Sequence, residues 1–128
     1  MEWTKIQLKE DIDKLIDEFS GFYDSCIAKC SYTTGMIVDK NKNMKYSGDS
    51  DMKLVFHSQS HSPIEICFEE IKEANIHTSD NAQYLNDINS ATFFMEDGLI
   101  YWSDGTDWNK NNTYIICKKV KYRKHKGE

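Results

Sequence analysis

The dipeptide Asp97-Gly98, which separates two runs of β-branched and aromatic residues, constrains the fold of this chain more than any other feature. Asp-Gly tolerates positive φ at both central positions of a two-residue turn, so the pattern predicts a type I′ β-hairpin over residues 91–104. The turn also sets the register, which places Glu96 opposite Leu99, Met95 opposite Ile100, Phe94 opposite Tyr101 and Phe93 opposite Trp102. Because both faces of this hairpin are apolar, we expect it to lie near the centre of a sheet and to be covered on both sides.

The length and composition predict one domain that spans residues 1–128. A domain of this size buries roughly two-thirds of the surface of its unfolded chain, and the 16 aromatic residues supply a core without metals or disulfides. The chain opens without an export signal and has no apolar run near the ~18 residues of a membrane span, so we expect a cytoplasmic protein without a membrane partner. In that compartment the cysteines are expected to be buried free thiols: Cys26, Cys30, Cys67 and Cys117.

The first 20 residues predict an amphipathic helix over about 4–20. Thr4 fits the N-cap, Gln7 completes a capping box three residues later, and Trp3 with Leu8 fits a hydrophobic staple. Gly21 fits the position that ends the helix. The apolar stripe of this helix consists of Ile6, Ile12, Leu15, Ile16 and Phe19.

From Cys26 the apolar period changes to two, which predicts a sheet over about 26–122. Residues 69–77 fit either a short helix or a strand, and the pattern favours a strand over Ile71 to Ile76. The whole chain therefore predicts an α+β domain, an N-terminal helix packed on a mostly antiparallel twisted sheet of about six or seven strands. The other expected segments are a long half-buried strand over 26–38 with a bulge at Gly35, a polar loop over 39–51, and strands over 52–58, 64–68 and 113–122.

Two segments copy the first half of a calcium-binding loop, Asp39-x-Asn41-x-Asn43 and Asp107-x-Asn109-x-Asn111. Both lack the glycine at position six, and position twelve is Ser50 or Lys118 where a bidentate glutamate is needed. We therefore expect ordinary polar turns at both places. The spacing of His57, His61 and Cys67 also falls short of a zinc site, so no metal and no cofactor are predicted.

Catalysis is one alternative function. The six glycines are scattered singly, which excludes a glycine-rich phosphate loop, and no strand-turn-helix elbow presents a nucleophile. Among the paired carboxylates, Asp104 and Asp107 lie beside Trp102 and Trp108, where an aromatic wall can raise the pKa of a carboxyl group. A small hydrolase-type enzyme with a site near Trp102 and Asp104 is therefore the least implausible enzymatic interpretation.

The charge distribution suggests a second alternative. Residues 1–117 hold 10 basic and 20 acidic side chains, whereas residues 118–128 hold six basic and one acidic. This basic end, with a tail over about 121–128, can contact phosphates, so a nucleic-acid-binding or anti-defence protein remains open. The acidic body repels a polyanion, however, and an edge strand whose lysines block edge pairing explains the same residues.

The acidic body favours a different partner. Clustered carboxylates around exposed aromatic side chains suit the binding of a basic protein surface, because complementary charge speeds encounter and aromatic residues anchor the contact. We therefore predict a non-catalytic protein-binding module. Its predicted binding residues are Asp104, Asp107 and Trp108. If the two loops meet, Tyr46, Asp49 and Asp51 join them.

The chain resembles a group of small uncharacterised proteins from Firmicutes. The resembling segments are Phe22-Tyr23-Asp24-Ser25-Cys26-Ile27, Ile64-Glu65-Ile66-x-Phe68, Ala91-Thr92 with Gly98-Leu99-Ile100-Tyr101-Trp102-Ser103-Asp104, and Tyr122-Arg123. Position 23 is often His in that group and is Tyr here, so a role for a His-Asp pair does not carry over. The resemblance implies relatedness but names no activity. By analogy of size and charge, small acidic α+β proteins also include immunity partners of basic bacterial toxins.

Overall fold

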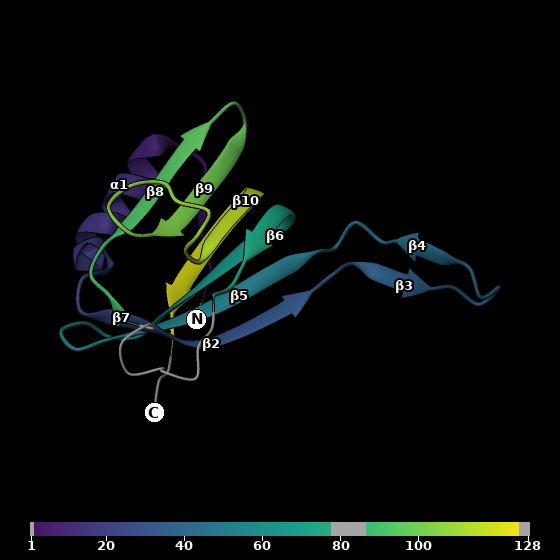
Figure 1. Cartoon of the computed structure of the whole chain (residues 1–128), viewed down its shortest axis with the longest axis horizontal. Coiled ribbons are helices and arrows are strands. Elements are labelled where there is room, and N and C mark those ends of the chain that lie inside the picture. Colours follow the sequence, from purple (N-terminus) through teal and green to yellow (C-terminus); the bar gives the residue numbers. More distant parts are fainter. Residues whose placement is uncertain (1, 78–86, 126–128) are drawn as a thin grey trace.

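The computed structural model describes residues 2–77 and 87–125, which form one α-helix, a 3-10 turn and ten strands. Figure 1 shows the helix against one side of a strongly coiled sheet, with a two-stranded projection on the other side. The elements in chain order are β1 (Thr4–Ile6), α1 (Lys9–Glu18), η1 (Ser20–Phe22), β2 (Ser25–Thr33), β3 (Met36–Val38), β4 (Met44–Tyr46), β5 (Asp51–Ser58), β6 (Ile64–Asn75), β7 (Asp87–Ile88), β8 (Ala91–Glu96), β9 (Leu99–Asp104) and β10 (Tyr114–Lys124).

The main sheet is antiparallel and nearly closes into a barrel. Its strand order is β7-β2-β5-β6-β10-β9-β8, and β1 pairs with the second half of β10, beyond the part that β9 covers. The two end strands, β7 and β8, are separated by only two residues of chain, so the ends of the sheet approach each other (Figure 1). The predicted α+β class and antiparallel sheet are confirmed.

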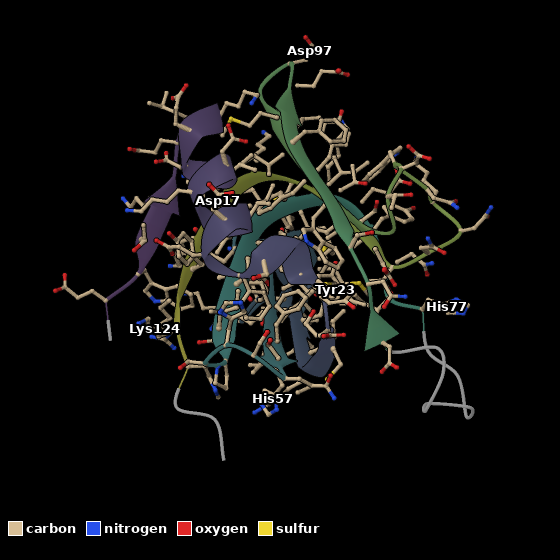
Figure 2. All side chains as sticks on the ribbon, turned by 90° about the vertical axis from the view of Figure 1, so that its left-hand side faces the viewer. Asp17, Tyr23, His57, His77, Asp97 and Lys124 are labelled. Carbon is tan, nitrogen blue, oxygen red and sulfur yellow. The ribbon has the colours of Figure 1, made fainter. Side chains whose placement is uncertain are left out.

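The Asp97-Gly98 hairpin has the predicted turn and register. Both turn residues have positive φ, 52° and 79°, and Phe93 pairs with Trp102 while Glu96 pairs with Leu99. Figure 2 shows Asp97 at the outer tip of this hairpin. Its predicted central position is wrong, because β8 is an end strand of the sheet.

The helix begins five residues later than predicted. Residues Thr4–Ile6 pair with β10 as strand β1, so Thr4 is not the N-cap. The carboxylate of Asp11 instead accepts hydrogen bonds from the N–H groups of Gln7 and Leu8, both at 2.8 Å, and these bonds hold the pKa of Asp11 below its usual value. The predicted capping box at Thr4 and Gln7 is therefore wrong: the N-cap is Leu8, because pairing with β10 outweighs the local helix preference of Thr4–Ile6.

The core lies between the helix and the inner face of the barrel. The helix contributes Ile12 and Leu15, both almost fully buried, and Phe19 follows at its end. Phe22 packs edge-on against Phe19, Phe56 and Trp102 with ring centroids 5.1–5.7 Å apart. Aromatic rings from the end of the helix, from η1 and from strands β5 and β9 therefore fill the middle of the barrel.

Three other strand predictions can be compared with the structure. Residues 69–75 continue β6, which confirms the strand interpretation. The register with β10 shifts between Ile116 and Cys117, so Lys72 of β6 is the extra residue of a bulge. Strand β10 runs to Lys124, so residues 121–124 are sheet, not tail. The expected strand over 26–38 is interrupted at Thr34 and Gly35, and its second half is exposed.

All four cysteines are free. Cys67 and Cys117 are buried as predicted, but Cys26 is half-buried and Cys30 is exposed.

Candidate protein-binding site

Strands β3 and β4 form a hairpin that extends away from the barrel (Figure 1). They pair only with each other among the described residues and make a separate two-stranded sheet. We call residues 34–50 the arm. The sequence predicts a polar loop over residues 39–51, and this expectation is wrong for Met44–Tyr46, which are strand β4.

One face of the arm is apolar and open to solvent. The register pairs Met36 with Tyr46 and Val38 with Met44, so these four side chains share a face, while Ile37 and Lys45 occupy the other. The exposed fractions of the four are 53%, 55%, 62% and 79%. Of the eight large apolar residues exposed in the described chain, five belong to the arm and Tyr32 lies two residues before it.

Local hydrogen bonds shape both ends of the arm. At its tip the carboxylate of Asp39 accepts bonds from the N–H groups of Asn41 (2.9 Å) and Asn43 (3.0 Å), which makes the calcium-like segment an ordinary polar turn, as expected. At its base the ring of Tyr46 lies over Gly35, where any side chain would clash with it. The Tyr46 hydroxyl is 3.0 Å from Oγ of Ser50.

An acidic hollow adjoins the base of the arm. It has a volume of about 360 Å³ and is lined by Gly48, Asp49, Ser50, Asp51, Glu69, Glu70 and Lys119. Asp51 lies directly opposite Glu69 in the β5–β6 pair, and like charges at such positions destabilise a sheet. Lys119 pairs with Glu70 at 3.2 Å and Lys121 with Glu69 at 3.5 Å, which offsets part of the negative charge. Because Ser50 lines the hollow and contacts Tyr46, the hollow adjoins the end of the apolar face that is nearest the barrel.

The predicted binding residues fall into two separate groups. Tyr46 and Asp49 belong to the arm, and Asp51 borders it in the hollow. Asp104, Asp107 and Trp108 belong to the end of β9 and the loop that follows it. Figure 1 shows this loop beside the β8–β9 hairpin, far from the arm. The two loops do not meet.

Trp108 folds back onto the outer face of the barrel. Its ring packs edge-on against Phe94, Tyr101 and Tyr114, at centroid distances of 6.0, 5.3 and 5.6 Å. Phe94 and Tyr101 also stack at 4.7 Å. Trp108 thus covers the second apolar face of the hairpin, for which the sequence predicts a cover. The Trp108 side chain is itself half-buried.

Asp104 and its neighbour Asp107 differ in environment. Asp107 is exposed, whereas Asp104 is half-buried and its backbone is held by Thr113 and Asn112. Burial raises the pKa of Asp104, and a hydrogen bond from the N–H of Gly105 opposes that shift. Trp102, the other residue of the predicted enzymatic site, is fully buried in the core.

Three of the five basic side chains of strand β10 form ion pairs with glutamates of β6. Arg123 forms hydrogen bonds and an ion pair with Glu65 at 2.8 Å, in addition to the two lysine pairs beside the hollow. The guanidinium of Arg123 also lies 4.0 Å from the ring centroid of Trp3. These pairs reduce the positive charge that the strand can offer to phosphates.

The strand register also brings together a group of side chains that sequence reasoning missed. Cys26 lies opposite His57 on β5 and opposite Asp87 on β7, and the three line a cavity of about 250 Å³. Figure 2 shows His57 at the end of the molecule opposite Asp97. These three side chains come together only because β5 and β7, which are far from β2 in the sequence, pair with its two edges. Within residues 2–77 and 87–125, no group of three or more His, Cys, Asp or Glu side chains is arranged to hold a metal ion.

Comparisons of the chain with protein-family models, with curated proteins and with solved structures find no match. The resemblance to the Firmicute group therefore stays a prediction. In the described residues, no helix is long and apolar enough to cross a membrane.

Proposed function

We propose that this chain is a non-catalytic protein-binding module and that the arm is its principal contact element. The observation that carries this proposal is the set of four apolar side chains on one face of the arm, each more than half exposed. Contiguous apolar surface of this kind marks interaction sites in soluble proteins, whereas single exposed apolar residues are common. Burial of each of these side chains against a partner would contribute about 1 kcal/mol.

The acidic hollow indicates the charge of the partner. Asp51 opposite Glu69, with Asp49 beside them, leaves a surface that a basic group stabilises. The proposed partner is therefore a protein that presents basic side chains next to an apolar patch. An immunity-like role, in which this partner is a basic toxin domain, is one form of the proposal and rests on size and charge alone.

A pull-down from lysate of the source organism tests the proposal. Tagged wild-type protein is compared with the variant Val38→Glu/Met44→Glu, which places two charges on the apolar face. Leu8→Glu is the matched control, because Leu8 is 61% exposed but lies at the start of the helix, off the arm. We expect a stoichiometric protein that wild type and the control retain and that the arm variant loses.

Retention of the same protein by the arm variant would show that the arm is not the contact element. Recovery of nucleic acid that elutes steeply as salt rises would favour the alternative based on the basic end. That alternative is tested with Lys124→Glu, at the end of β10, because removing residues 121–124 would also remove two of the three pairing partners of β1.

A further inference from the structure

We infer that the partner of the arm is a second copy of this chain, with two arms packed face to face about a two-fold axis. The inference rests on the proposed function and names its partner. The apolar face suits such pairing, because a two-fold interface uses the same surface on both copies. Met36, Val38, Met44 and Tyr46 of one copy would cover the same four residues of the other.

The charges of the arm favour an antiparallel arrangement. Lys40 and Lys42 lie at the exposed tip, whereas Asp49 and Asp51 lie at the base. When two hairpins stack face to face about a two-fold axis across them, the tip of each reaches the base of the other. Each pair of tip lysines then meets the acidic hollow of the other copy, whose like-charged pair Asp51 and Glu69 is relieved by them.

The continuity of the surface supports the same arrangement. Tyr46, the member of the apolar face closest to the barrel, contacts Ser50, which lines the hollow. The apolar face therefore lies between the tip lysines and the acidic hollow, and adjoins the hollow at Tyr46. The contact is narrow, because it uses one face of a two-stranded hairpin. A narrow contact predicts a dissociation constant of the dimer in the micromolar range, and the dimer should weaken as the salt concentration rises.

Analytical ultracentrifugation of charge-reversed chains tests this inference. One variant carries Lys40→Glu/Lys42→Glu and has acidic side chains at both tip and base. The other carries Asp49→Lys/Asp51→Lys and has basic side chains at both. We expect each variant alone to dimerise at least tenfold more weakly than wild type. An equimolar mixture should recover a dimer of wild-type affinity, because each tip then faces a base of opposite charge.

Two controls accompany this experiment. Circular dichroism and thermal unfolding of each variant establish that it folds, which is expected because three of the four residues are exposed and Asp51 is half-buried. Val38→Glu/Met44→Glu should abolish the dimer, whereas Leu8→Glu should leave it unchanged.

Three results would overturn the inference: a wild-type monomer at all concentrations, a dimer that the arm variants do not weaken, or a variant mixture that fails to form a dimer. These failures are distinguishable from failure of the proposed function. A monomeric wild type that captures a different protein through the arm rejects only the second copy as partner. A monomer that captures nothing through the arm rejects both.

Discussion

At the scale of single residues, substitution of Trp108 distinguishes a structural role of its side chain from a role in binding. Its ring packs edge-on against three aromatic rings on the outer face of the barrel. We expect Trp108→Ala to lower the free energy of unfolding by about 2 kcal/mol, because a half-buried indole loses these contacts. Denaturant unfolding of Trp108→Ala measures this loss. Asp107→Ala is the control, because Asp107 is exposed and its substitution should change the free energy of unfolding by less than about 0.5 kcal/mol.

A loss of partner binding in Trp108→Ala without loss of stability would instead restore Trp108 as a binding residue. The sequence places this aromatic residue among carboxylates, which predicts an exposed binding residue. It could not determine which way the ring points, because that depends on Phe94 and Tyr101, which form the surface beneath it only after β8 and β9 pair.

Asp104 gives a pH-dependent prediction at the same scale. Burial raises the pKa of its carboxyl group in the folded protein above the ordinary value. A group shifted in this direction favours folding below its unfolded pKa, about 3.9. That contribution is lost as the pH rises through the folded pKa. We expect Asp104→Asn to be more stable than wild type at pH 7, with a difference that disappears as the pH falls to about 3.

Thermal unfolding between pH 3 and pH 7 checks this prediction, with Asp107→Asn as the control from the same loop. A variant that is less stable than wild type at pH 7 would contradict it. In that case, hydrogen bonds to the ionised carboxylate outweigh the cost of burying its charge.

At the scale of elements, the arm should be separable from the barrel. Its strands pair only with each other among the described residues, and the N–H of Ser47 already donates to the carbonyl of Gly35 at 2.7 Å. Replacing residues 36–46 by Asn-Gly would close a two-residue turn at that point. We expect the free energy of unfolding to change by less than about 1 kcal/mol while arm-dependent association is lost. A shift in guanidinium unfolding by several kcal/mol would show that the arm supports the core.

Elements defined by local signals could be predicted, and elements defined by distant partners could not. The Asp97-Gly98 turn carries its own φ requirement, so its type and register follow from two residues. Thr4 to Ile6 carry a helix-start pattern, but pairing with β10, more than 110 residues away, makes them a strand. Met44 to Tyr46 are flanked by polar residues, and only pairing with β3 makes them a strand.

At the scale of the whole molecule, the near closure of the sheet explains why an apolar hairpin can lie at its end. The chain leaves β7 and enters β8 two residues later, so it passes directly from one end of the sheet to the other. Helix α1 and the loop of Trp108 then cover the two faces of the hairpin that a central position would have buried between other layers. The apolar residues on both faces of the hairpin therefore predicted its burial correctly but could not predict strand order.

Closure also predicts that the barrel unfolds as one unit, which its thiols can report. Cys67 on β6 and Cys117 on β10 are buried in adjacent central strands, and burial raises the pKa of Cys67 to about 11 and that of Cys117 to about 12. Because the thiolate is the reactive form, both should resist alkylation at pH 8.

Intact mass measurement after iodoacetamide treatment should show two groups added to the native chain, at exposed Cys30 first and then at half-buried Cys26. With increasing guanidinium, the third and fourth groups should appear together, at the transition seen by tryptophan fluorescence. A third group that appears before this transition would show that β6 and β10 separate before the rest of the barrel, and would contradict cooperative unfolding.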